Sequence, residues 1–527
     1  MRPKVAYFLC AALIFVAAAQ NRFSLPQDPL ETRDGYLLPA LTKLSGGAFP
    51  HIQGRNFIYP GTIYLILRIF ADFRVISVIQ HVLGLIAGAL FLASWSRLSD
   101  FFPKPRLNRA LHEAIGLFGA AIYLLSSTPV FLEMQIRPDA VCVFFEMLMF
   151  WLIIQFFYYR VMSPDALKAV GYGTAAAINA FLLASLKPSF TVMGLFTVVA
   201  VIWLILADKG NFIGKLAFFA IAVPVILALT ITEHYLRRND ETVRMFLPKT
   251  LFAIHANIIH AQMAADLKNG KTVSYSREWL QGACSDLGTE IQRIQSLYPE
   301  KFPVLGFNAD YLMNRGADPL LSRWQRQLGD EQFLKFLHYW YWHSVMSRPL
   351  AFARKIVRQL AVFYSTNCPA FGIKKIPTVW TYPASFSALS DSQSPRLLAA
   401  LPSGADFLKR TSKLRFSGVV IHQGKWVQAW NIWFARTYLA TLLVSVPLAG
   451  WFLLKRDNSD KQKWPAFFVI FLYSANFGNV VGISVVHTME GWRYSAVQFI
   501  AAIFAQLWAA RWLLEIALAK LPASKPR

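Results

Sequence analysis

Residues 75–94 read VISVIQHVLGLIAGALFLAS, a long apolar run without aspartate, glutamate, lysine or arginine. A helix needs about 20 predominantly apolar residues to cross the hydrocarbon core of a bilayer. Several further runs along the chain approach or exceed that length. The alternating pattern expected of an outer-membrane barrel does not dominate anywhere. The sequence therefore predicts an all-α polytopic membrane protein.

The composition supports this class. Hydrophobic residues make up 55% of the 527 residues and charged residues only 16%, yet the formal net charge is +24. In a polytopic protein such an excess commonly comes from lysine and arginine in cytoplasmic loops. No groove-reading motif accompanies the charge, so we do not expect nucleic acid as a partner. Part of the charge can instead serve lipid head groups or phosphates.

The apolar runs predict about ten transmembrane helices. The first has the basic start and short apolar stretch that cleaved signal peptides also show. We expect it to be retained, because every segment on one side of the membrane is then basic, as cytoplasmic segments are. Both termini are accordingly predicted to be cytoplasmic. The expected spans are residues 5–21, 75–95, 110–127, 140–158, 169–186, 189–207, 214–232, 432–453, 465–486 and 494–515.

This topology predicts three parts: an N-terminal transmembrane module over 1–235, an outer region over 236–431 after the seventh helix, and C-terminal helices over 432–527. The first outer loop, residues 20–74, contains FIYPGTIYLILRIFADF, which proline and charged residues interrupt. We expect it to form an interfacial helix rather than another span. Within the outer region, aromatic and basic residues interleave over 331–365, as suits the head-group layer.

The first outer loop carries the best indication of chemistry. Asp28, Glu31 and Asp34 precede an amphipathic segment, and Arg55 follows it. Transfer of a group from a lipid phosphate to a hydroxyl or amine needs a base for the acceptor proton and cations for the departing phosphate. The loop carboxylates fit the first task. Cations at predicted outer helix ends fit the second: Arg55, Arg137, Lys187 and Arg493.

Four of these residues also have a structural interpretation. Asp34 can cap a helix that starts near Gly35, and Lys187 can satisfy the dipole of a helix end. Arg137 and Arg493 can extend towards the membrane interface without any further role. Their convergence on one predicted side of the membrane is what favours a site.

The sequence requires no cofactor. The histidine pairs 255/260 and 338/343 are five residues apart, whereas metal pairs on a helix commonly lie four apart. A divalent cation held through hard oxygen ligands is conceivable, with Asp34, Glu31 or Glu133 as its ligands. No phosphate-cradling glycine loop, GxSxG or CxxC motif occurs. Cys284 and Cys368 can pair if the outer region faces an oxidising compartment.

Several runs resemble the N-terminal module of bacterial C-type (GT-C) glycosyltransferases, which are related to the protein O-mannosyltransferases and the lipid A aminoarabinose transferase. The resemblance is clearest over residues 20–235. It rests on DGYLLPALTKLSGG, GRNFIYPGTIYLILRIF, VIQHVLGLIAGALFL and EMQIRPDAVCVFFEMLMFWL, on Lys187-Pro188 where relatives often have Arg-Pro, and on WRYSAVQF near the last span.

The resemblance implies a GT-C-like fold and a polyprenyl-phosphate sugar donor. In that family a seven-helix module carries the catalytic carboxylate in the first outer loop, so Asp34 becomes the implied base and Arg55 an implied phosphate contact. Relatives often place the acid about four residues before the tyrosine of a YLxxA-like run. Four residues before Tyr36 stands Thr32, and Asp34 and Glu31 lie two and five residues before it. Both acids therefore remain candidates.

We therefore expect an inverting glycosyltransferase at the outer, periplasmic face of the inner membrane, in contact with the lipid bilayer. The acceptor would be a glycan, a lipid or a protein. A secondary transporter or flippase for lipid-linked glycans is the alternative from another class, although the functional charges of transporters more often lie at mid-membrane. A glycan polymerase is a further alternative that shares the topology.

Overall fold

The structure is a computed structural model. It describes residues 3–30, 35–49, 56–102, 105–207, 212–237, 241–271, 275–297, 309–313, 318–365, 368–372, 380–381, 394–414, 418–419, 421–455, 463–486 and 494–520. Almost all regular structure in these residues is helical, and the exceptions are two-residue strands, β1 (Trp380–Thr381) and β2 (Gly418–Val419), which pair antiparallel.

The structure confirms a polytopic α-helical membrane protein. Within the described residues, nine helices are long and apolar enough to cross a membrane, or ten if one bent pair forms a single span. Each predicted span has a counterpart among them. The nine are α1 (Pro3–Phe23), α4 (Arg74–Leu98), α7 (Asp139–Phe157), α8 (Ala166–Leu186), α9 (Thr191–Leu206), α10 (Phe212–Arg237), α21 (Lys425–Leu454), α22 (Lys463–Val486) and α24 (Phe499–Lys520).

The bent pair corrects the predicted span at 110–127. It consists of α5 (Arg109–Leu124) and α6 (Ser127–Glu133), which meet at an angle of 51°. The break coincides with Pro129, which has no N–H to bond the carbonyl of Leu125, and Arg22 on α1 donates a 2.8 Å hydrogen bond to the carbonyl of Leu124. A carbonyl that a longer helix would satisfy internally is satisfied here by a side chain.

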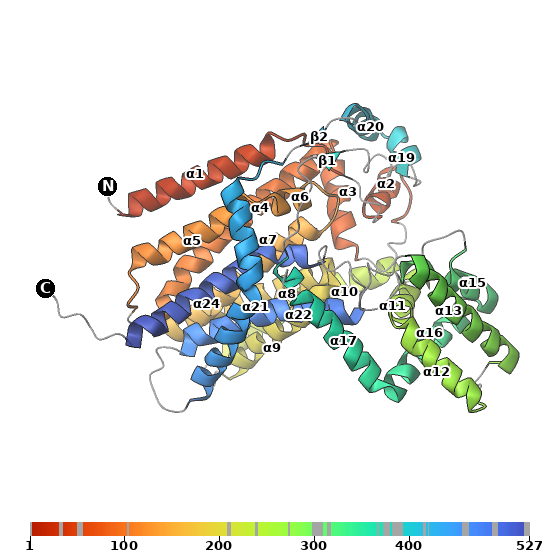
Figure 1. Cartoon of the computed structure of the whole chain (residues 1–527). Coiled ribbons are helices and arrows are strands. Elements are labelled where there is room, and N and C mark those ends of the chain that lie inside the picture. The colour runs from red at the N-terminus through yellow and green to blue at the C-terminus, as the bar shows by residue number, and fades with distance from the viewer. Residues whose placement is uncertain are drawn as a thin grey trace.

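Figure 1 shows that both termini lie at one end of the helix bundle. The opposite end carries α2 (Leu37–Leu44), α19 (Ser394–Ala400), α20 (Pro402–Leu414) and the helices that follow α10. This arrangement agrees with an even number of spans. It also places the first loop and the long region at the same end, as the sequence predicts.

The apolar segment of the first loop forms α3 (Ile58–Phe70), which has 13 residues. At 1.5 Å per residue it is about 20 Å long, too short to cross a hydrocarbon core of about 30 Å. It is not among the candidate spans of the described residues. The expectation of a short helix rather than an eleventh span is confirmed.

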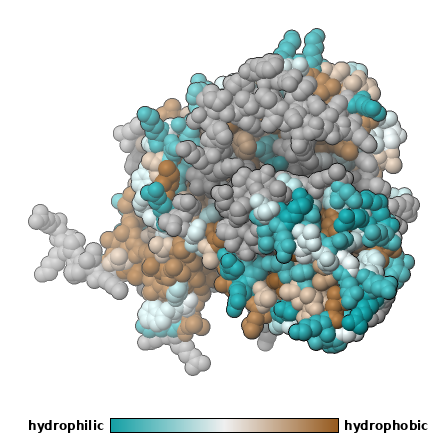
Figure 2. All heavy atoms as spheres, turned by 45° about the vertical axis from the view of Figure 1, so that its right-hand side comes forward, coloured by the Kyte–Doolittle hydropathy of each residue, from teal (hydrophilic) through white to brown (hydrophobic). Residues whose placement is uncertain are grey.

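The predicted outer region, 236–431, contains two structurally different parts. The first has its own core, in which Phe252, Trp324 and Phe336 are fully or almost fully buried. It comprises α11 (Glu241–Ile254), α12 (Ala256–Lys268), α13 (Arg277–Leu297), α14 (Asp310–Met313), α15 (Leu320–Leu328) and α16 (Asp330–Ser347). Figure 2 shows a largely hydrophilic surface over this part, beside a hydrophobic flank of the bundle.

The second part packs with the bundle. Residues from α17 (Pro349–Phe363) to α20 contribute Phe363 and Phe407 to the core of the transmembrane helices. The ring of Phe407 stacks on Phe73 at 4.5 Å between centroids. The next helix, α21, begins at Lys425 rather than at the predicted 432, because its first turns already pack: Asn431 is buried and donates to the hydroxyl of Ser126 at 2.9 Å.

Short helical turns connect several of these elements. Four are 3-10 turns and one, η2, is a π-helix. They are η1 (Ser99–Phe101), η2 (Tyr158–Met162), η3 (Pro188–Phe190), η4 (Pro369–Phe371) and η5 (Ala496–Gln498).

Candidate functional site

The first loop is anchored beside the turn that follows α6. The backbone NH of Leu30 donates to the carbonyl of Met134 at 2.8 Å, and the NH of Ile136 donates to the carbonyl of Leu30 at 2.9 Å. These bonds form a parallel bridge with Gln135 as the paired residue. The acidic segment of the loop therefore begins next to the junction of α6 and α7.

Tyr36 anchors the loop on the other side of that segment. Its ring packs edge-to-face against Tyr59 of α3, with centroids 5.4 Å apart. The Tyr59 hydroxyl donates to Gln80 of α4 at 3.3 Å. The Gln80 amide in turn donates to the carbonyls of Glu133 and Gln135 at 3.0 Å each. Both flanks of the acidic segment therefore meet the same group of residues.

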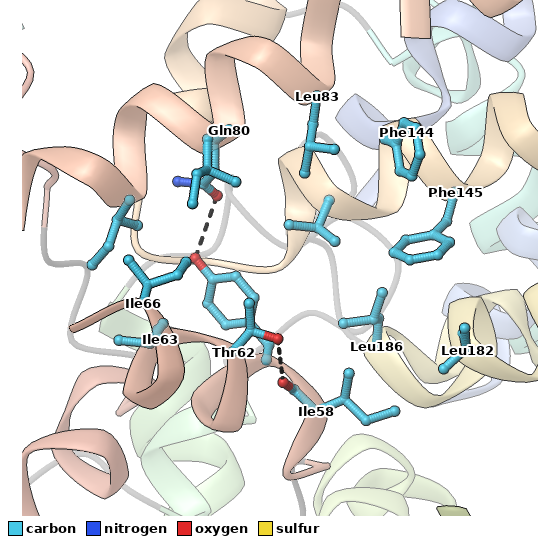
Figure 3. A pocket seen from close by; sticks show the side chains of 14 residues that line it. Ile58, Thr62, Ile63, Ile66, Gln80, Leu83, Phe144, Phe145, Leu182 and Leu186 are labelled. Atoms are coloured by element: carbon cyan, nitrogen blue, oxygen red, sulfur yellow. Dashed lines mark hydrogen bonds between the residues drawn. The ribbon is translucent and has the colours of Figure 1, made fainter. Parts of the chain in front are cut away.

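A cavity of about 230 Å³ lies beside these anchors, between α3, α4, α7 and α8 (Figure 3). Its lining is mostly apolar, with Tyr59, Thr62 and Gln80 as the polar exceptions. Among the side chains that line it are Ile63, Leu83, Phe144, Phe145, Leu182 and Leu186. Such a lining suits a hydrocarbon chain.

An ion pair follows directly on the last lining residue of α8. Lys187 donates to Asp139 at 2.6 Å, and both residues are buried. The Lys187 ammonium also lies 5.1 Å from the ring centroid of Tyr494. Asn56 donates to the carbonyl of Ser185 at 2.5 Å. The cavity lining, the buried cation Lys187 and Asn56, which follows Arg55, therefore meet at the end of α8.

Four of the sequence-predicted site residues lie outside the described residues: Glu31, Asp34, Arg55 and Arg493. The structure describes the others: Tyr36 packs against Tyr59, which lines the cavity, and Lys187 directly follows the lining residue Leu186. Arg137 is half-buried between α6 and α7 and donates to the Gln135 side chain at 3.3 Å.

Asp28 is tied to the second part of the long region. It accepts a 2.8 Å hydrogen bond from Arg410 on α20, which also contacts Asp72 at 3.5 Å. Burial acts to raise the pKa of Asp72, but hydrogen bonds from Arg74 and the nearby arginine charges outweigh it and lower the pKa. Asp28 therefore connects the first loop to α20.

Glu133 is fully engaged inside the bundle. Its two carboxylate oxygens accept hydrogen bonds from Arg22 at 2.8 and 2.9 Å, and one also meets His81 Nδ1 at 2.8 Å. Only 2% of Glu133 is exposed. In the part of the chain that the structure describes, no three His, Cys, Asp or Glu residues gather as metal ligands would. The expectation that Glu133 is a ligand of a divalent cation therefore gains no support.

Gly84 provides room for this carboxylate. A Cβ at residue 84 would lie 2.0 Å from a carboxylate oxygen of Glu133. We expect Gly84→Ala to displace the carboxylate and to destabilise the protein by about 1–3 kcal/mol, as overpacking does. Thermal unfolding in detergent measures this loss. Gly171→Ala on α8 is the matched control, because nothing lies within 4 Å of its Cβ position; an equal effect of both substitutions would contradict the expectation.

The four cysteines are free thiols in the structure. Cys284 belongs to the core of the first part of the long region, and Cys368 belongs to the core of the bundle. The pairing of these two, which the sequence left open, does not occur here.

Sequence reasoning did not single out Asp139, Arg22, His81 or Lys355. Asp139 follows Pro138 in the run EMQIRPDAVCVFFEMLMFWL. A carboxylate at the start of an apolar span is the sequence signal that could have identified it. Arg22, His81 and Lys355 lie at or within apolar helical segments, where a buried charged or titratable side chain needs a partner.

The described helices define a multi-pass membrane protein with an apolar cavity at one end of its bundle. No family model matches the chain, and neither curated proteins nor solved structures give a match. The further argument about its function therefore rests on the site itself.

Proposed function

We propose that the chain is an inverting GT-C-type glycosyltransferase. It moves a sugar from a polyprenyl-phosphate donor to a glycan, lipid or protein acceptor at the outer face of the inner membrane. One observation carries the proposal: the acidic segment of the first loop is flanked by Leu30 and Tyr36, and both flanks are anchored beside an apolar cavity that ends at a buried lysine.

The cavity suits the donor's hydrocarbon chain. Its walls are apolar side chains of four helices (Figure 3), and burying such surface is favourable by about 25 cal/mol per Å². The polar end of the donor would then lie towards Lys187, where the lining ends. An apolar cavity that ends at a cation matches a lipid with a hydrocarbon tail and a phosphate head group.

The reaction needs only a base and a phosphate site. Asp34 or Glu31 accepts the proton of the acceptor's hydroxyl or amine while its oxygen or nitrogen forms a bond to the anomeric carbon. The bond between that carbon and the phosphate oxygen breaks, and polyprenyl phosphate leaves with the electron pair. Attack from the opposite face inverts the anomeric configuration. Arg55, with Arg137 or Lys187, would hold the leaving phosphate.

The proposal is tested with purified full-length protein in lipid vesicles that contain a polyprenyl-phosphate sugar labelled in the sugar. Extracts of the cell envelope supply the acceptors. Transfer of the label, with release of polyprenyl phosphate, supports the proposal. Movement of intact labelled lipid between leaflets without cleavage would instead identify a flippase.

The size of the cavity predicts a chain-length effect. Leu182→Trp adds bulk to the lining, so we expect KM to rise about tenfold for a long-chain polyprenyl-phosphate sugar, a loss of about 1.4 kcal/mol of binding. A farnesyl-phosphate sugar, with a shorter tail, should be affected much less. The comparison of the two KM values measures the effect.

Leu195→Trp on α9 is the control for this variant, because Leu195 is exposed on the bundle surface. It should leave both KM values unchanged. Equal KM changes for long and short donors in the Leu182 variant would place the donor tail elsewhere.

One observation favours the transporter alternative. Glu146 lies fully buried within the apolar helix α7, and its carboxyl accepts a 2.6 Å hydrogen bond from Gln498. Titratable groups inside a membrane often mark transport pathways. Glu146→Gln separates the two functions, since a transporter would lose leaflet-to-leaflet movement while a glycosyltransferase would retain sugar transfer.

A further inference from the structure

The described part of the chain contains four lysine or arginine residues that are more than nine-tenths buried: Arg22, Lys187, Lys355 and Arg511. Three of them have a carboxylate partner. Arg22 pairs with Glu133 at 2.8 Å, Lys187 with Asp139 at 2.6 Å and Arg511 with Glu515 at 2.6 Å. Lys355 has no carboxylate within ion-pair distance among the residues described, and this difference needs an explanation.

Lys355 occupies the buried stripe of α17. Phe352, Lys355, Gln359 and Phe363 share that face, which packs on α22. The Lys355 ammonium donates a 2.7 Å hydrogen bond to the carbonyl of Ser484, in the last turn of α22. One carbonyl uses one of the three donors of an ammonium group. A buried charge of this kind is costly unless a counter-ion accompanies it.

The burial lowers the pKa of Lys355 to about 8. The side chain is therefore still mainly a cation at neutral pH. Its charge acts on His255, whose pKa is lowered to about 3 by burial and by the Lys355 charge, so that this histidine is neutral. Neither group supplies the missing negative charge.

Lys355 is connected to the end of the candidate site. Its partner Ser484 lies two residues beyond Gly482, which packs against the backbone of Ser189 so closely that a Cβ would lie 3.1 Å from that carbonyl oxygen. Ser189 is two residues from Lys187. Tyr494, the first described residue after α22, has its ring centroid 5.1 Å from the Lys187 ammonium.

We propose that Lys355 is an anion-binding residue that takes the phosphate of a lipid-linked substrate at the junction of α17 and α22. This inference rests on the proposed function, because it adds Lys355 to the cations proposed for the phosphate of the donor. Lys187, which the sequence predicted for that task, is already neutralised by Asp139. Among the residues that the structure describes, Lys355 has no carboxylate partner, and the bond to Ser484 uses one of its three hydrogen-bond donors.

The test measures binding by thermal unfolding of the full-length protein in detergent at pH 7. The probes are polyprenyl phosphate, polyprenol of the same chain length and inorganic phosphate. We expect polyprenyl phosphate to raise the Tm of the wild type more than polyprenol does. Lys355→Gln keeps a donor for the Ser484 carbonyl but removes the charge, and it should weaken polyprenyl phosphate binding about 10- to 100-fold, the contribution of one charged hydrogen bond.

Lys355→Met is the second variant. Its unpaired charge is removed, so its Tm without ligand should equal or exceed that of the wild type, and its response to the phosphate should also be lost. Lys335→Met, at an exposed position of α16, is the control and should respond like the wild type. A Lys355-dependent shift with inorganic phosphate alone would identify free phosphate as the ligand.

The proposal is overturned if either Lys355 variant keeps the full difference between polyprenyl phosphate and polyprenol. The binding and transfer measurements together distinguish a failure of the Lys355 proposal from a failure of the proposed transferase function. Phosphate binding through Lys355 without any sugar transfer would leave the site standing and remove the transferase. If Lys355→Gln transferred sugar with the wild-type rate and donor KM, the transferase proposal would stand and the proposed role of Lys355 would be rejected.

Discussion

Asp34→Asn is expected to lower the rate of sugar transfer by about two to four powers of ten, the usual contribution of a general base. Asparagine has nearly the shape of aspartate but cannot accept the acceptor's proton. The donor KM should therefore change little while kcat falls. Glu31→Gln is expected to cause a much smaller loss, because the resemblance makes Asp34 the first choice and Glu31 the second.

Initial rates with a labelled polyprenyl-phosphate sugar measure this effect, and the Tm of each variant in detergent checks its folding. Asp286→Asn is a suitable control. Asp286 is an exposed aspartate on α13 whose carboxylate contacts Arg323 at 3.2 Å, in a part of the protein with its own core. If Asp34→Asn and Glu31→Gln both retained the full rate, a first-loop carboxylate would not be the base. A large loss in Glu31→Gln alone would transfer the role to Glu31.

The transmembrane part of the fold could be predicted from the sequence because its signal is local. A run of about 20 apolar residues has few alternatives to a spanning helix, and every predicted span has a helix at its position. The exact ends of the helices and the bends within them were harder to predict from the sequence. The break near Leu125 had a local signal in Pro129, but the contact of Arg22 with the Leu124 carbonyl and that of Asn431 with Ser126 had none.

The candidate site was predictable only in part. The first loop was singled out from its acids, and its described flanks do meet at a cavity. The hydrogen-bond partners of the buried cations could not be predicted, since Arg22 and Glu133 are 111 residues apart and Lys355 and the carbonyl of Ser484 are 129 apart. A signal existed at Lys355: a basic residue stands in an apolar stripe with Phe352 and Phe363. Such an interruption indicates a buried partner or ligand.

The largest expected effect on stability comes from the buried pair of Arg22 and Glu133. We expect Glu133→Leu to destabilise the protein by about 3–5 kcal/mol, because the Arg22 guanidinium would remain buried without its counter-ion. Arg22 also holds the carbonyl of Leu124 at the break between α5 and α6. The apparent Tm in detergent should fall accordingly, and proteolysis near that break should become faster.

The double variant Arg22→Met/Glu133→Leu decides whether the charge or the packing is responsible. If the unpaired charge causes the loss, removing both charges should restore most of the stability, because a buried ion pair and well-packed apolar residues of similar volume are often equivalent. His81, which also contacts Glu133, is unchanged in both variants. A double variant as unstable as the sum of the two single variants would show that the pair does not act as a unit. The bend at Leu125 would then depend on each side chain separately.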